Sequence, residues 1–213
     1  PEGNGKKVAI DAGHQAHGNS EQEPIGPGAS QTKAKVASGT TGRTTGVTEY
    51  QLNLDVSLKL RDELEARGYE VYMIRETNDV DISNAERAQL AAESGADILV
   101  RIHANGSDNT SVAGALTMAP STANPYLSQE LTAECQKLSQ CIITTFCAST
   151  GANNQGVYHT EEMSGRNWCS IPATIVEMGY MTNPDEDTRM QTAEYQQQMV
   201  TGIADGIDQY FAL

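Results

Sequence analysis

The sequence predicts one α/β domain, built on a mainly parallel sheet with helices on both faces. Three observations predict this fold class. Short apolar runs alternate with longer helical segments, which is typical of parallel sheets. The length of 213 residues suits a single domain of this kind. Hydrophobic residues make up 38% of the chain, enough for a core. No apolar run approaches the ~18–20 residues of a transmembrane helix.

The first segments are expected to form a strand, a helix and a second strand. Val8–Asp11 is a short apolar run of strand length. Residues 50–67 exceed the ~10 residues of a long strand and are followed by Gly68, so they are predicted to be a helix. Tyr69–Arg75 alternates in the manner of a strand.

The middle of the chain continues the alternation. Ser83 and Glu86 have the spacing of a capping box, which predicts a helix from there to about Ser94. Ile98–Ile102 is expected to be a buried strand, and Gly114–Ala119 an edge strand.

The last third is expected to begin with a long helix over residues 124–149, because Asn124-Pro125 resembles a helix start and Gly151 a helix stop. A buried strand is expected around Ile175-Val176. Residues 183–186 are expected to open a short helix, and residues 193–210 to form the last one.

Residues 15–46 interrupt this pattern. They are rich in Gly, Ser, Thr and Pro and contain few apolar residues. Long structureless connections are uncommon inside compact domains. Because this one follows His14, we interpret it as an insertion over the active-site face; the alternative is a mobile surface loop. Residues 1–6 are interpreted as a linker or trimmed terminus.

The charge and the cysteines exclude some classes of function. The net charge is −14, which argues against nucleic-acid binding, since that requires basic patches. Four cysteines without a Cys-x-x-Cys pair argue against a structural zinc knuckle. Three of them, Cys135, Cys141 and Cys147, fall in one predicted helix, so they are not expected to pair with one another.

Four side chains are predicted to meet at one edge of the sheet. His14, His103 and Glu177 each follow a predicted strand. The carboxyl ends of parallel strands lie together, and Glu49 at the start of a helix can enter from the side. Two histidines and a glutamate provide the ligands of a catalytic zinc, and a further carboxylate is then left to move protons. Taken singly, each histidine is more simply a structural or surface residue and Glu49 a helix-start residue. Glu177 is harder to explain in that way, because a carboxylate directly after a buried apolar run is costly unless it is paired.

These residues stand in blocks that resemble one protein family. The blocks are Val8–His14, Glu49 with Asn53-Leu54, Ile102–Asn105, and Glu177–Asn183. In this order they resemble the zinc-dependent N-acetylmuramoyl-L-alanine amidases of bacterial cell walls (amidase type 3 family).

The resemblance implies a catalytic domain over residues 7–213 with a six-stranded, mostly parallel sheet. It implies one Zn²⁺ per chain, bound by His14, Glu49 and His103, with Glu177 as the catalytic carboxylate. Asn105 and Trp168 are weaker candidates for contacting substrate, and for Trp168 core packing is an equal alternative.

The implied reaction is hydrolysis of the amide between N-acetylmuramic acid and L-alanine in peptidoglycan, by a secreted autolysin or a cell-wall remodelling or cell-separation enzyme. The expected chain is a monomer located in the cell wall, without membrane insertion, and a fused wall-targeting domain would deliver it. Two alternatives remain open at this point: a zinc peptidase or carboxypeptidase, and a non-enzymatic wall-binding module.

Overall fold

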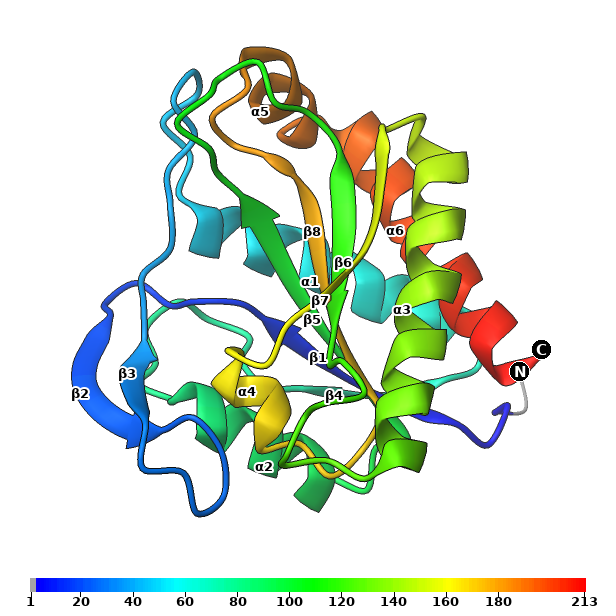
Figure 1. The fold of residues 1–213 in the computed structure, drawn as a ribbon. Coiled ribbons are helices and arrows are strands. Elements are labelled where there is room, and N and C mark those ends of the chain that lie inside the picture. Colours follow the sequence, from blue (N-terminus) through cyan, green and yellow to red (C-terminus); the bar gives the residue numbers. More distant parts are fainter. Residues whose placement is uncertain (1–2) are drawn as a thin grey trace.

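The computed structural model describes residues 3–213, which form a six-stranded sheet with helices on both faces (Figure 1). The strand order is β4-β1-β5-β8-β6-β7. Neighbouring strands are parallel except for β6 and β8, which are antiparallel. This architecture confirms the predicted fold class. The bounds are β1 Lys7–Ala12, β4 Glu70–Met73, β5 Ile98–Asn105, β6 Ala115–Ala119, β7 Asn154–His159 and β8 Ala173–Tyr180.

Two apolar layers hold the helices against the sheet. Strand side chains alternate between the faces, so in β1 Val8 and Ile10 join the larger core while Ala9 joins a smaller one. The larger core contains α1, α3 and α6, and the smaller one contains α2. The helices are α1 Glu49–Ala66, α2 Asn84–Glu93, α3 Gln129–Thr150, α4 Ser164–Asn167, α5 Pro184–Met190 and α6 Ala193–Phe211.

The helix ends follow local chemistry. The Ser83 hydroxyl accepts a hydrogen bond from the Glu86 N–H, as the predicted N-cap requires. Gly151 ends α3 at φ 73°, a left-handed conformation that glycine adopts without steric cost. Pro184 occupies the first turn of α5 behind the N-cap Asn183.

Two predictions about this part of the chain are wrong. The strand at residues 114–119 is not an edge: β6 lies between β8 and β7, and β7 is the outer strand. Helix α3 begins at Gln129 rather than at Pro125, because Ser128 caps it by accepting from the Leu131 N–H. The Asn124 side chain accepts from the Tyr126 N–H instead, so this Asn-Pro pair forms a turn before the helix.

Residues 15–46 contain regular structure that the sequence pattern did not predict. Strands β2 (Asn19–Pro24) and β3 (Thr32–Val36) form an antiparallel hairpin, separate from the main sheet. In Figure 1 the hairpin stands beside the sheet, on the side where α2 and α4 lie. The indole N–H of Trp168 donates to the carbonyl of Pro24 at 2.9 Å. The side-chain amide of Asn167 donates to the backbone carbonyl of Ile25, also at 2.9 Å. These contacts join the hairpin to the α4 segment.

The remaining expectations concern termini, thiols and membrane spans. Of the linker predicted at residues 1–6, Pro1 and Glu2 lie outside the described residues, and the Asn4 N–H donates to the Gly68 carbonyl. Cys135, Cys141, Cys147 and Cys169 are all free thiols, as the helix argument requires for the first three. Among the described residues, no helix combines the length and the apolar character needed to cross a membrane.

Candidate metal centre

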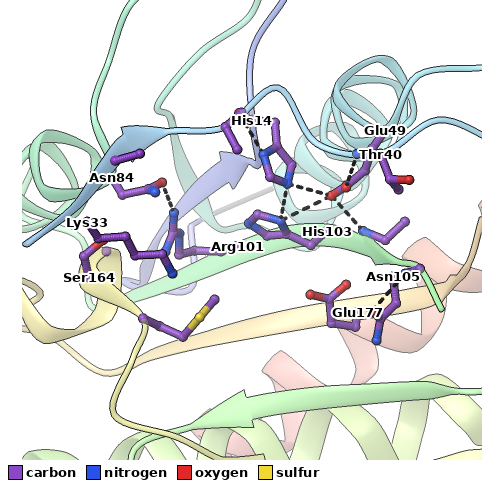
Figure 2. Close-up of a pocket in the computed structure, with 16 residues that line it drawn as sticks. His14, Lys33, Thr40, Glu49, Asn84, Arg101, His103, Asn105, Ser164 and Glu177 are labelled. Carbon is purple, nitrogen blue, oxygen red and sulfur yellow. Dashed lines mark hydrogen bonds and ion pairs between the residues drawn. The ribbon is translucent and has the colours of Figure 1, made fainter. Parts of the chain in front are cut away.

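Four side chains from separate elements converge at the carboxyl edge of the sheet. His14 follows β1, His103 lies near the end of β5, and Glu49 opens α1. Glu177 lies on β8 in register with His103, so both side chains point to the same face of the sheet. Figure 2 shows the two imidazole rings and the Glu49 carboxylate meeting at one point, with Glu177 beside them. The structure therefore brings together the four residues that the sequence analysis singled out.

Three donor atoms form the centre of this cluster. His14 Nε2 lies 3.0 Å from Glu49 Oε2, and His103 Nδ1 lies 3.3 Å from the same oxygen. The two nitrogens are 3.2 Å apart. Two imidazoles and one carboxylate at such distances could hold a metal ion.

The His14 ring is oriented for this role by the backbone of the insertion. Its Nδ1 donates to the carbonyl of Ala37 at 2.9 Å, which leaves the lone pair of Nε2 free in the neutral ring. His14 itself has φ 63°, a left-handed conformation that is uncommon for a residue with a side chain. Such strained residues are found at functional sites, where the surrounding structure holds them.

The Glu49 carboxylate is held as an anion. Its Oε2 accepts from the Asn53 amide and from the Ala104 N–H, each at 3.2 Å. Its Oε1 accepts from the Thr40 N–H at 3.2 Å. Burial alone would raise the pKa of Glu49, but the hydrogen bonds and charges of His103 and His14 hold it well below its usual range.

The side chains of His103 and Glu177 are both neutral near neutral pH when no metal ion is bound. Burial lowers the pKa of His103 to about 4, against the opposing effect of Glu49, so the imidazole is an available ligand near neutral pH. Burial and the nearby Glu49 charge raise the pKa of Glu177 to about 8. Oε2 of Glu177 is buried and has no hydrogen-bond partner among the described residues. Such an uncompensated carboxyl group is costly and indicates a functional site.

The cluster lies at one end of a cavity of about 460 Å³. The insertion supplies part of its wall through Lys33, Ala34, Ala37 and Thr40. The segment 163–165, at the start of α4, closes the far side. Figure 2 shows Lys33, Asn84, Arg101 and Ser164 grouped away from the metal-binding cluster. The cavity therefore has one end with the candidate metal ligands and a second, cationic end.

A buried ion network supports the floor of the cavity. Asp11 Oδ1 accepts from Arg87 Nη1 and Asp11 Oδ2 from Arg101 Nε, each at 2.9 Å. Burial alone would raise the pKa of Asp11, but the charges of Arg87 and Arg101 keep it far below its usual range. Arg87 also donates to the His14 carbonyl at 3.0 Å. The network thereby fixes the backbone that carries the first histidine.

The weaker candidates occupy different positions. Asn105 lines the cavity, and its side-chain oxygen accepts from the Gly106 N–H at 2.9 Å. Trp168 is not among the residues that line this cavity; it packs against the smaller core. The two remaining histidines of the chain lie elsewhere: His17 lines a separate surface hollow with Asp79 and Asp81, and His159 is exposed at the end of β7.

Sequence reasoning missed several residues that shape the centre. Gly39 has φ 86°, and a Cβ there would lie 2.8 Å from His14 Cδ2 and 2.9 Å from Glu49 Oε1. Only glycine suits this conformation and this close approach. Arg101 did leave a signal in the sequence, because it is a charged residue inside an otherwise apolar buried strand.

Comparisons with known proteins agree on one family. The sequence model of a family described as N-acetylmuramoyl-L-alanine amidase matches residues 8–209. The N-acetylmuramoyl-L-alanine amidase LytC of Bacillus subtilis is 27% identical over 166 residues, covering 78% of this chain and 32% of LytC. The amidase AmiA of Escherichia coli is 26% identical over 211 residues, covering 83% of this chain and 72% of AmiA.

A solved structure gives the same result for the fold. The N-acetylmuramyl-L-alanine amidase Ami1 from Mycobacterium smegmatis superposes with a TM-score of 0.88 at 25% identity, covering 100% of this chain and 99% of that chain. This chain therefore spans about a third of LytC but nearly all of the Ami1 chain.

Proposed function

Because the chain belongs to the family of N-acetylmuramoyl-L-alanine amidases, we propose that it hydrolyses the amide between N-acetylmuramic acid and L-alanine in peptidoglycan. The observation that carries this proposal is the convergence of His14, Glu49 and His103 beside Glu177 in one cavity. A wall-binding module without activity has no use for a buried carboxyl group that lacks a partner.

We infer that the metal is zinc, with one ion per chain. Zinc in catalytic sites takes three protein ligands from histidine and carboxylate groups and keeps one position open. Ligands ~2.0–2.1 Å from the centre of a tetrahedron lie roughly 3.3–3.4 Å apart. The three donor atoms are separated by 3.0, 3.2 and 3.3 Å. Their chemistry and their spacing therefore fit zinc.

In this proposal Glu49 and Glu177 have different roles, which follow from their different contacts. When bound, zinc supplies a Lewis acid that polarises the scissile carbonyl and makes water more acidic. Glu49, held by three hydrogen bonds, is a ligand. Glu177, whose Oε2 is unpartnered among the described residues, is free to take a proton from the attacking water and to deliver it to the departing L-alanine nitrogen. A nearby divalent cation favours the ionised carboxylate that this role requires.

The proposed setting is a secreted enzyme of the bacterial cell wall, acting as an autolysin or in wall remodelling and cell separation. The net charge of −14 opposes approach to anionic wall polymers. We therefore expect the catalytic domain to depend on an attached wall-targeting domain for delivery, and we propose that it acts as a monomer.

The experiment that tests this function uses purified peptidoglycan and the zinc-loaded protein. An amidase releases intact stem peptides with a free L-alanine amino group and leaves the glycan strands uncut. A zinc peptidase or carboxypeptidase would instead release amino acids or shortened peptides, and a binding module would release nothing.

A further inference from the structure

Arg101 lies on the same face of β5 as the proposed metal ligand His103. Residues two apart in a strand share a face and are ~7 Å apart. Arg101 is only 3% exposed, yet it lines the active-site cavity together with Lys33 and Asn84. Figure 2 shows these side chains at the end of the cavity away from Glu177.

The guanidinium of Arg101 is only partly neutralised. Its Nε donates to Asp11 Oδ2 at 2.9 Å and its Nη2 to Asn84 Oδ1 at 2.8 Å. Asp11 also pairs with Arg87, so one buried carboxylate serves two cations. Within the described residues, Nη1 of Arg101 has no hydrogen-bond partner. This nitrogen packs closely on the backbone of Gly165, where a side chain with a Cβ would not fit. One donor of a buried cation is therefore unpaired among the described residues, in a side chain that lines the cavity.

Lys33 adds a second cation from the opposite wall. It belongs to strand β3 of the hairpin, and its hydrogen bond to the carbonyl of Glu162 is a long one of 3.3 Å. The only carboxylates among the residues that line this cavity are Glu49 and Glu177, at the metal-binding end. In a chain of net charge −14, these two cations at one end of the cavity have only one paired carboxylate, Asp11, which Arg101 shares with Arg87. The excess of positive charge there indicates a site for an anionic group.

We propose that Arg101 and Lys33 bind a carboxylate of the stem peptide and make the enzyme selective for substrates that carry it. This inference rests on the proposed function. An arginine fork matches a carboxylate in shape, and lysine adds a point charge. The ~7 Å between positions 101 and 103 equals about two residues of extended peptide. Two carboxylates of the stem peptide lie within that distance. The first is the α-carboxylate of the second residue, which stays free because this residue is linked to the next one through its side chain. The second is a carboxylate of the third residue.

The test compares soluble muropeptides that differ by one amide. One pair carries the second-residue α-carboxylate free or amidated, and the other pair differs in the same way at the third residue. The variants are Lys33→Met, on the exposed hairpin, and Arg101→Lys, which keeps the charge but loses the fork. Lys35→Met is the matched control, because Lys35 lies two residues along β3, pairs with Glu21, and is not among the residues that line the cavity.

Wild type is expected to favour one acidic substrate by roughly ten- to hundredfold in kcat/KM, the range of a charge-assisted hydrogen bond. Lys33→Met and Arg101→Lys should reduce that preference mainly by slowing cleavage of the acidic substrate, and Lys35→Met should keep it. The pair that shows the preference identifies the carboxylate. Equal cleavage within both pairs by wild type, or an unchanged preference in a folded Lys33→Met, would overturn the proposal. Failure to cleave any muropeptide would instead count against the proposed function.

Discussion

His14 Nε2 and Glu49 Oε2 lie 3.0 Å apart, although the whole insertion separates them in the chain. The insertion returns to the same point on its way to α1, where Ala37 accepts from His14 Nδ1 and Thr40 donates to Glu49. Gly39 lies between these two contacts. The segment 15–46 therefore supports the candidate metal-binding cluster and also forms part of the cavity wall.

Gly39→Ala should weaken zinc binding by roughly ten- to hundredfold, the usual effect of disturbing the groups that orient metal ligands. The new Cβ would come within 3 Å of both His14 and Glu49. Gly28→Ala is the matched control, because Gly28 also has a positive φ, of 75°, but a Cβ there meets nothing within 4 Å. Competition with a zinc-chelating dye measures both affinities. Equal affinities in the two variants would contradict the prediction that Gly39 supports the arrangement of His14 and Glu49.

His103→Ala should lose zinc more severely than Gly39→Ala, because it removes a donor atom rather than displacing one. We expect more than about a hundredfold loss of affinity, beyond the range for orienting groups. His159→Ala, at an exposed position on β7, should bind zinc normally. The measurement is the metal content after dialysis at low free zinc. Full occupancy in His103→Ala would remove this residue from the ligand set.

Glu177→Gln and Glu49→Gln should separate chemistry from metal binding. The Glu177→Gln substitution keeps the shape of the side chain and should keep the zinc, but an amide cannot accept a proton, so the hydrolysis rate should fall by roughly 10²–10⁴. Glu49→Gln should lose zinc first, since Glu49 Oε2 faces both histidine nitrogens. Zinc content and hydrolysis rate are measured on both variants side by side. Loss of zinc from Glu177→Gln would make Glu177 a ligand instead.

Zinc-free protein should become less stable relative to zinc-free Glu177→Gln as the pH rises from about 5 to 8. The pKa of Glu177 is raised from 4.5 to about 8 in the folded state, so between these values the unfolded chain releases a proton that the folded chain retains. The contribution of Glu177 is therefore complete below pH 4.5 and is lost as the pH rises through 8, on the order of a few kcal/mol. Urea unfolding with a chelator present measures this. Glu177→Gln should lack this loss, and parallel curves for the two proteins would refute the assignment.

The order of the strands and helices other than β2, β3, β7 and α4 could be predicted from the sequence for local reasons, and so could the proposed metal ligands. Apolar runs identified β1, β5 and β8, and strand-end positions identified His14, His103 and Glu177. Parallel strands bring such ends together whatever the loops do. The start of α3 was misplaced because Asn-Pro forms either a turn or a helix start, and only the Ser128 cap decides between them.

The cavity walls could not be predicted, because they depend on contacts between distant segments. The β2–β3 hairpin is polar and lacks the apolar alternation that identifies a strand. It is held by tertiary contacts such as that between the Trp168 indole and the Pro24 carbonyl. Lys33 and Arg101 line one cavity only because the hairpin packs beside α2 and the α4 segment, and no local pattern encodes that approach.

The most direct test of the central claim is mass spectrometry of purified peptidoglycan digested by the zinc-loaded protein. The account predicts soluble stem peptides that begin with a free L-alanine amino group, together with glycan strands of unchanged length that carry free lactyl carboxylates. The chelated protein and Glu177→Gln should yield almost none of these products. Release of free amino acids or shortened peptides, with the lactyl–alanine bond intact, would contradict the account.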